Sequence, residues 1–390
     1  MEKKLKMGMI GGGPDAFIGE VHRIAARMDG LIELTCGAFS SDPEKSRETA
    51  RKLFLPEDQG YSSFEELIIK EAQKPEEDRI DFVSVVTPNH THFGPASLAL
   101  EHGFHVVLEK PMTLTLREAL DLEKQVKDSG LILALTHTYS GYPMVKQAKA
   151  MIAEGKLGAI RKVVVEYPQG WLSRLSELEG NKQAIWRTDP TRSGKSGAMG
   201  DIGTHAAHLA EYITGLKIKD ICADISIMVP GRKLDDDGNV LLRFNNGARG
   251  VLIASQVSAG EENALNIQVY GEQGGLHWHQ QEPNSLIIKM LEEPVQVYRT
   301  GNTYRHPYAL STYAQHNSRT PSGHPEGLLE AFGNIYRNFA LTVDAYKKGV
   351  TPAPELLDFP KVSEGVRGML FIDKVIESSK SNEKWIAFTC

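Results

Sequence analysis

The first third of the chain alternates short apolar strands with helices, and this alternation limits the possible folds more than any other feature. Strand-like runs cover residues 5–10, 31–39, 80–87, 105–108 and 131–136. The run 80–87 is almost continuously apolar, as is typical of a strand buried on both faces of a parallel sheet. Helical patterns fill the intervals between the runs. The pattern predicts an α/β domain over residues 1–136, built on a doubly wound parallel sheet.

A different pattern begins at residue 137. A helix is expected over 144–154 and a strand over 159–167, followed by a long irregular stretch. From residue 218 onward strands meet in hairpins, most clearly around Asn245-Asn246-Gly247. With 390 residues the chain is long enough for two cores. We therefore expect residues 137–390 to form an α+β domain with a large, mostly antiparallel, open-faced sheet.

Charge and cysteine content exclude several classes of protein. The net charge is -6 and no basic block occurs, so we expect no nucleic-acid and no membrane partner. The three cysteines, Cys36, Cys222 and Cys390, are odd in number and far apart, which indicates a reducing compartment and no metal cluster. The apolar run after the charged N-terminus stops at three glycines, and no stretch is long enough to span a membrane. The expected location is the cytoplasm.

A glycine-rich turn follows the first strand and opens the first helix. Glycines let the backbone approach a pyrophosphate, and the start of a helix offers N–H donors to its oxygens. We predict a Rossmann dinucleotide site here, with Gly19 in place of the usual third glycine. At the end of the second strand Ser40 stands where an acidic residue normally binds the ribose of NAD. NAD is the expected cofactor, and NADP stays open. The cofactor residues predicted from these two turns are Gly11, Gly13, Phe17, Ile18, Ser40 and Ser41.

Two further segments reach the carboxyl edge of the predicted parallel sheet, where such sheets bind ligands. One is Glu109-Lys110-Pro111, directly after a short apolar strand. The other follows the strand 80–87, and its Asn89 and His92 are expected to line the nicotinamide ribose. A lysine at this edge is either solvated or used in chemistry. The cofactor residues predicted from these segments are Thr87, Pro88, Asn89, His92, Glu109 and Lys110.

The second chemically informative stretch is Ser193–His208. If Asp201 begins a helix, then Asp201, His205 and His208 lie on one face of it. A carboxylate, an imidazole and a lysine directed at a nicotinamide would suffice for alcohol oxidation: a base takes the hydroxyl proton while hydride leaves the same carbon. Two alternatives remain at this point. The spacing could hold a metal, although no carboxylate cluster accompanies it, or Asp201 could be a plain helix cap followed by surface histidines.

Taken together, these motifs resemble the Gfo/Idh/MocA family of oxidoreductases. The resemblance rests on the glycine turn, the segment 87–92, Glu109-Lys110-Pro111 and the Asp201…His205 pair, and it spans nearly the whole chain. It implies Lys110, Asp201 and His205 as the catalytic group, with His205 as the base and Asp201 orienting it. It also implies that Trp186 and Arg187 lie near the nicotinamide, and that the open sheet carries substrate and subunit contacts in a homodimer or homotetramer. His208 stands where many members have an aspartate.

The expected activity is NAD(P)-dependent hydride transfer at a hydroxyl carbon of a sugar, glycoside or polyol. The alternative is an NAD-dependent redox glycosidase, which some members of the superfamily are, acting through transient C3 oxidation, elimination, water addition and re-reduction. Its substrate could be an anionic glycoside such as a sulfoquinovoside. A regulatory protein without turnover is a third possibility. The substrate-binding residues expected in either enzyme are His137, Arg192, Lys195, His205, His208, Tyr304 and His306.

Overall fold

The computed structural model describes residues 3–14 and 16–390, and the chain folds into two compact units. The first unit comprises Met1–Thr138 and Leu328–Val366, and the second comprises Tyr139–Gly327 and Arg367–Cys390. The segment Leu328–Val366 is therefore part of the first unit, although it follows residue 137 in the sequence. Packing explains this, because its long helix buries an apolar face on the first sheet.

The first unit contains a five-stranded, fully parallel sheet in the order β2-β1-β3-β4-β5. All five predicted strands are present. A helix start is also marked by local side-chain contacts: Thr115 and Glu118 form a reciprocal capping box at the start of α5. The strands and the main helices of this part are β1 (Leu5–Gly11), α1 (Phe17–Arg27), β2 (Ile32–Ala38), α2 (Pro43–Lys52), α3 (Phe64–Ala72), β3 (Phe82–Val86), α4 (Phe93–Glu101), β4 (His105–Leu108), α5 (Leu116–Ser129) and β5 (Leu133–Leu135).

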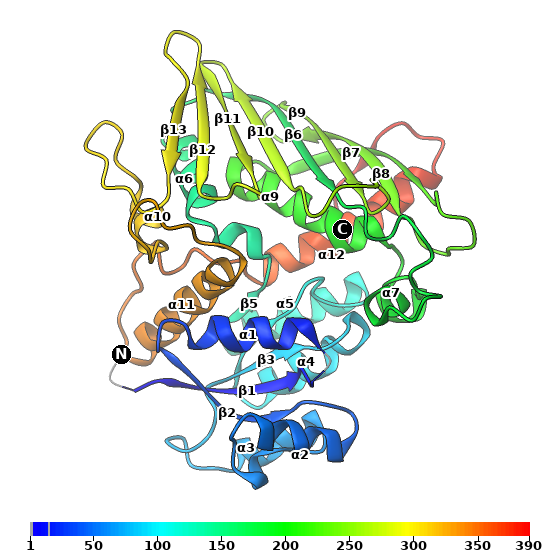
Figure 1. Cartoon of the computed structure of the whole chain (residues 1–390), viewed down its shortest axis with the longest axis vertical. Coiled ribbons are helices and arrows are strands. Elements are labelled where there is room, and N and C mark those ends of the chain that lie inside the picture. The colour runs from blue at the N-terminus through cyan, green and yellow to red at the C-terminus, as the bar shows by residue number, and fades with distance from the viewer. Residues whose placement is uncertain (1–2, 15) are drawn as a thin grey trace. The chain divides into compact units, whose positions relative to one another are not determined.

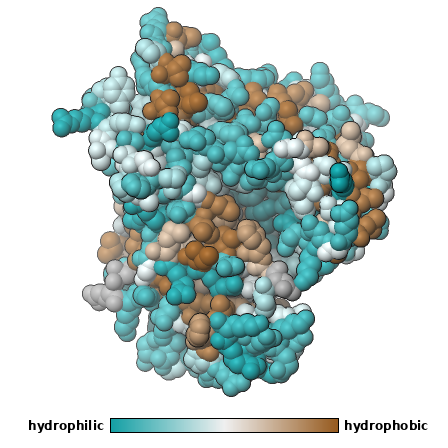
Figure 2. Space-filling view, in the orientation of Figure 1, coloured by the Kyte–Doolittle hydropathy of each residue, from teal (hydrophilic) through white to brown (hydrophobic). Residues whose placement is uncertain are grey.

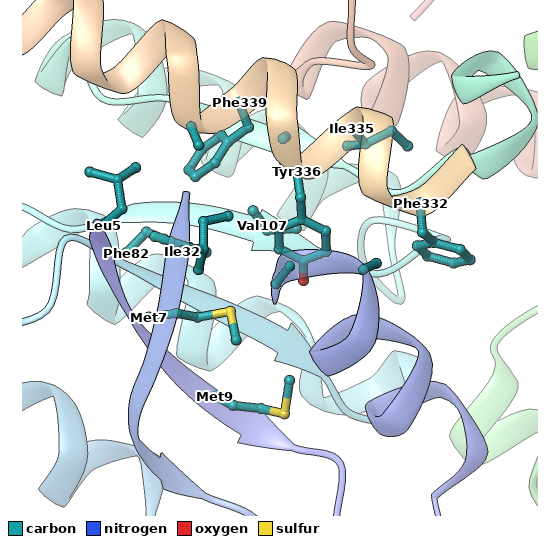
Figure 3. Close-up of a cluster of buried hydrophobic side chains, with 14 of the residues drawn as sticks. Leu5, Met7, Met9, Ile32, Phe82, Val107, Phe332, Ile335, Tyr336 and Phe339 are labelled. Carbon is teal, nitrogen blue, oxygen red and sulfur yellow. The ribbon is translucent and has the colours of Figure 1, made fainter. Parts of the chain in front are cut away.

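Helix α11 (Leu328–Lys347) completes the core of the first unit and lies beside α1 (Figure 1). Figure 3 shows Phe332, Tyr336 and Phe339 pointing from α11 toward the strands and α1. The Phe339 ring lies edge-on to Phe82 of β3, with ring centroids 4.9 Å apart. An aromatic side chain buried in this way contributes several kcal/mol, roughly 3–5 by the cost of its removal. The core of the first unit is therefore built from two distant parts of the sequence.

The second unit contains a nine-stranded sheet in the order β13-β12-β11-β10-β6-β9-β8-β7-β14. Only the β6–β9 pair is parallel, so the sheet is mostly antiparallel as predicted. The hairpin expected around Asn245–Gly247 joins β8 and β9. The strands are β6 (Ile160–Pro168), β7 (Ile218–Ser226), β8 (Asp237–Phe244), β9 (Arg249–Ser255), β10 (Asn266–Gly271), β11 (Gly274–His279), β12 (Ser285–Met290), β13 (Gln296–Arg299) and β14 (Ile386–Ala387).

Helices cover only one face of this sheet (Figure 1). Helices α6 and α9 contact β12, β11, β6, β9 and β10, and α12 meets β7 through a hydrogen bond from the Ala223 amide to Ser378. Along β8, Val240 and Leu242 are buried and the intervening Leu241 is exposed, so the second face is open. Figure 2 shows apolar side chains on the surface over the β12–β13 hairpin, where Leu291 and Val295 are exposed. The helices of this unit are α6 (Pro143–Ala153), α7 (Lys182–Arg187), α8 (Pro190–Ser193), α9 (Thr204–Thr214), α10 (Thr312–His316) and most of α12 (Val362–Lys380).

Candidate active site

The turn after β1 is built around glycines that no other residue could replace without displacement. Gly12 has φ 74°, a conformation that disfavours a side chain. A Cβ on Gly19, in the first turn of α1, would lie 2.3 Å from the Gly12 Cα, and a Cβ on Gly13 would lie 2.9 Å from the Phe39 carbonyl oxygen. Arg23 of α1 donates to the Gly12 carbonyl oxygen at 2.7 Å. The sequence singled out Gly11, Gly13 and Gly19 but missed Gly12, which is the partner of Gly19 in the closest approach.

The end of β2 presents hydroxyls and a capping aspartate. Ser40 Oγ accepts from the Asp42 amide at 3.1 Å, and Asp42 caps α2 by accepting from the Glu44 amide at 3.0 Å. Of the two apolar residues predicted for the cofactor, Phe17 is 67% exposed and Ile18 packs against the core of the first unit. Asp42 is the carboxylate closest in sequence to the position where NAD-binding folds normally place an acid.

His92 holds two loops together at the edge of the parallel sheet. It is fully buried, and its ring nitrogens lie 2.8 Å from the carbonyl oxygens of Thr87 and Pro111. Burial lowers the pKa of His92, although both carbonyl contacts oppose this shift. His92 therefore ties the loop after β3 to the loop after β4, with Pro88 and the buried Asn89 between them in the first loop.

Glu109 and Lys110 follow β4 at the same edge. The Glu109 amide continues the ladder by donating to Val85 at 3.1 Å, and the Lys110 amide donates to Glu109 Oε2 at 3.1 Å. Glu109 is almost completely buried and Lys110 is half-buried. His137, just after β5, is also buried, and its amide donates to Leu135. The first unit thus brings the predicted residues of three strand ends to one edge of its sheet.

In the second unit Asp201 lies in a single π-helical turn, Met199–Gly203, that leads into α9. Its Oδ2 accepts from Arg187 Nε at 3.2 Å and from Gln256 Nε2 at 2.9 Å. His205 and His208 are both buried. The alternative of a helix cap with surface histidines is therefore wrong, because the helix begins before Asp201 and its carboxylate is held by side chains from α7 and the end of β9.

A network of phenols and amides surrounds this pair, and the sequence did not reveal it. Tyr139 lies edge-on to His205 with ring centroids 4.9 Å apart, and its hydroxyl meets that of Tyr167. Tyr167 and Gln169 both donate to Asn263 Oδ1, at 2.7 and 2.6 Å. The parallel β6–β9 register places Tyr167 beside Ala254, so both strands deliver their polar ends to one edge. We call Tyr139, Tyr167, Gln169, Arg187, Asp201, His205, Gln256 and Asn263 the Asp201 cluster.

The remaining predicted residues of the second unit lie in varied environments. Arg187 stacks on Trp186, with its guanidinium carbon 4.2 Å from the ring centroid. Lys195 pairs with Asp373 at 2.8 Å, and Tyr304 packs edge-on against Tyr298. His208 stacks on Tyr212, Arg192 is half-buried in α8, and His306 is exposed. Of this set, only Arg187 belongs to the Asp201 cluster.

No group of three or more His, Cys, Asp or Glu side chains that could hold a metal occurs in residues 3–14 and 16–390. Within the same residues no helix is long and apolar enough to cross a membrane.

One unit has a glycine turn on a parallel sheet, and the other has an Asp–His pair on a helix that packs against an antiparallel sheet; together they define the class of NAD-binding oxidoreductases. Residues 5–137 match the model for an oxidoreductase family with an NAD-binding Rossmann fold, and residues 145–277 match the GFO/IDH/MocA C-terminal domain. The chain belongs to the GFO/IDH/MocA family of NAD(P)-dependent sugar and polyol dehydrogenases. The expected family and fold are confirmed.

Relatives with known ligands extend over nearly the whole chain. An inositol dehydrogenase homolog from Azotobacter vinelandii with NAD+ has a TM-score of 0.92 and 35% identity, covering 99% of this chain and 97% of the other. Its complex with NADH and myo-inositol has a TM-score of 0.88 and 33% identity, covering 99% and 98%. Levoglucosan dehydrogenase from Pseudarthrobacter phenanthrenivorans is 26% identical, covering 98% of each chain.

Proposed function

We propose that the protein is an NAD-dependent dehydrogenase that oxidises a ring hydroxyl of a cyclic polyol or sugar. The observation that carries the proposal is the Asp201 cluster, in which a carboxylate and a buried imidazole lie among phenols and side-chain amides. NAD, when bound, accepts the hydride. The first unit would hold NAD, and the second would bind the substrate and other subunits.

Three side chains have separate roles in the proposed reaction. His205 takes the hydroxyl proton, and Asp201 orients the groups around it while staying ionised, because Arg187 and Gln256 both donate to its carboxylate. Lys110, as an ammonium ion, stabilises negative charge that develops on the substrate oxygen. Lys110 belongs to the first unit and the other two to the second.

The remaining members of the cluster suit a polyhydroxylated ring. Burial raises the pKa of Tyr139 and, more strongly, of Tyr167, so both phenols stay neutral donors at physiological pH. Gln169, Gln256 and Asn263 offer amides that both donate and accept, as sugar hydroxyls do. The myo-inositol complex of the Azotobacter relative supports a ring of this kind as the substrate class.

The test is to incubate the purified protein with NAD and a panel of inositols, free sugars and aryl glycosides, and to follow NADH absorbance and aglycone release together. The proposal predicts NADH in step with substrate consumed, fastest with a cyclic polyol or sugar. No observation favours the redox glycosidase. Aglycone release that requires NAD while NADH stays flat would replace the dehydrogenase proposal with the hydrolytic one.

Two lysine variants separate catalysis from regulation. Lys110→Met removes the proposed charge, and we expect kcat to fall by about 10²–10⁴. Lys124→Met is the matched control, because Lys124 pairs with Asp128 on the exposed side of α5 in the same unit as Lys110, and we expect unchanged kcat. Equal turnover in both variants would remove the catalytic assignment of Lys110.

The open face of the nine-stranded sheet is the surface we propose for assembly into a homodimer or homotetramer. Leu241, Tyr270 and Val297 are exposed on its strands. Exposed apolar groups gathered on one sheet face are typical of an interaction surface. Light scattering after size exclusion tests this: we expect a mass at least twice that of the chain, lowered by Leu241→Lys. A monomeric wild-type protein at micromolar concentration contradicts the proposal.

A further inference from the structure

The first unit contains a buried hydrogen-bond network that ends at Glu109, the residue before Lys110. The proposed reaction does not explain this network. Ser84 of β3 meets the Tyr336 hydroxyl at 2.7 Å, and that hydroxyl lies 2.7 Å from His22 Nδ1. His22 Nε2 in turn lies 2.9 Å from Glu109 Oε1. Thr136, after β5, donates to the same carboxylate oxygen at 2.5 Å. Each member comes from a different strand, strand end or helix, and all five are nearly or fully buried.

Glu109 fixes the direction of one hydrogen bond in this buried network, the bond that it makes with His22. Burial acts to raise the pKa of Glu109, but the hydrogen bond and charge interaction with His22, the charge of Lys110 and the hydroxyl of Thr136 together hold it below its usual value. A carboxylate only accepts, so His22 donates from Nε2. At its other nitrogen, Nδ1, His22 meets the Tyr336 hydroxyl, which in turn meets the Ser84 hydroxyl. Burial raises the pKa of Tyr336, which keeps its proton in place.

Packing confines His22 to this geometry. The centroid of its ring lies 5.0 Å from that of Phe332 and 5.7 Å from that of Tyr336, and both residues belong to α11. The same helix supplies the Tyr336 hydroxyl that contacts His22 Nδ1. A buried carboxylate and imidazole are expensive to desolvate, and an apolar pair of equal volume is often as stable or more stable. Stability alone therefore gives little reason for this pair.

The position of the Glu109–His22 pair beside Lys110 gives a reason for its presence. The Glu109 carboxylate accepts a hydrogen bond from the Lys110 amide, and the charge of Lys110 helps to lower the pKa of Glu109. We infer that His22 and Tyr336 are positioning residues that keep Glu109 ionised, and thereby keep Lys110 charged and oriented toward the substrate oxygen. This inference rests on the proposed function, because it presumes that Lys110 takes part in the reaction.

The test compares the pH profile of kcat in wild type, His22→Leu, His22→Gln and Tyr336→Phe. The inference assigns the alkaline limb of the wild-type profile to Lys110. His22→Leu removes the donor to Glu109, so we expect this limb to move about 1 pH unit lower and kcat at pH 8 to fall about tenfold, with little change in the NAD dissociation constant by fluorescence titration. His22→Gln keeps a donor and an acceptor, so it should restore both the position of the alkaline limb and kcat at pH 8. Tyr336→Phe should give a smaller shift in the same direction.

Controls separate this inference from the proposed function and from misfolding. His102→Leu changes a histidine at the C-terminal end of α4, whose Nδ1 lies 2.9 Å from the Leu98 carbonyl oxygen of the same helix, and it should leave the limb in place. Lys110→Met should abolish the limb, and its failure to do so would refute the proposed function whatever His22 does. An unmoved limb in His22→Leu or, if that variant does not fold, in Tyr336→Phe would refute the inference.

Discussion

Replacing Gly19 by alanine tests the dinucleotide turn with a single methyl group. The new Cβ would lie 2.3 Å from the Gly12 Cα and 3.0 Å from the Gly12 carbonyl carbon and oxygen, all of them backbone atoms. Ordinary contact begins near 3.4 Å, so the two backbones must separate by about 1 Å. Overpacking of this size costs about 1–3 kcal/mol, against a gain of about 1 kcal/mol or less from the better helix former.

The separation moves the turn that would receive the pyrophosphate. We expect Gly19→Ala to weaken NAD binding at least about tenfold, which corresponds to about 1.4 kcal/mol, and to lower the urea midpoint slightly. Fluorescence or calorimetric titration with NAD measures the first quantity, and circular dichroism in urea measures the second.

Gly94→Ala is the matched control. Gly94 also lies in the first turn of a helix of the same unit, α4, but a Cβ there would meet only Phe64 at an ordinary 3.6 Å. We expect unchanged NAD affinity and equal or slightly higher stability. If Gly19→Ala bound NAD as tightly as Gly94→Ala, the close approach of Gly12 and Gly19 would not be what shapes the site.

Three other perturbations address pH dependence, a buried ion pair and the Asp201 cluster. Burial, aided by Lys347 and opposed by Asp81, lowers the pKa of His105 to about 4. The folded state therefore binds fewer protons than the unfolded state between pH 6.5 and 4, and stability should fall by up to about 3 kcal/mol as the pH drops through this window, but less so in His105→Asn. Arg232→Met leaves two carboxylates without their buried partner and should lower the free energy of unfolding by about 3–5 kcal/mol. Gln256→Leu removes a donor to Asp201, and kcat/KM should fall roughly 10–100-fold while NAD affinity stays the same.

Urea titrations at several pH values check the first two, and steady-state kinetics check the third. An equal loss of stability with acid in His105→Asn and wild type would show that another group titrates. A change below about 1 kcal/mol in Arg232→Met would mean that the pair is well solvated. For Gln256→Leu, a rise in KM for NAD alone would place Gln256 at the cofactor and not at Asp201.

Sequence patterns were sufficient for the elements whose signals are local. The five parallel strands, the capping box at Thr115 and the hairpin at Asn245–Gly247 each depend on residues within one short window, and each is present. The same holds for the placement of Glu109 and Lys110 directly after a strand.

Features that depend on distant partners could not be predicted in this way. Tyr139 and Asn263 are separated by more than a hundred residues, and they meet only when the segment before α6 packs against the loop between β9 and β10. The helix around Asp201 starts earlier than expected because the Asp235 carboxylate, from a distant segment, accepts the amides of Gly197 and Met199 at its start. The amphipathic pattern of α11 predicts a buried face, but it does not say which sheet that face covers.

The return of α11 to the first unit also constrains how the protein is made. The last strand of the parallel sheet ends at Leu135 and α11 begins at Leu328, so residues 136–327 are synthesised between them. At 5–20 residues per second a ribosome needs roughly 10–40 s for that interval. Throughout it, Phe82 lacks Tyr336 and Phe339, the two aromatic side chains of α11 that finally pack against it. The core of the first unit therefore stays incomplete, and open to chaperone binding, until most of the second unit has been synthesised.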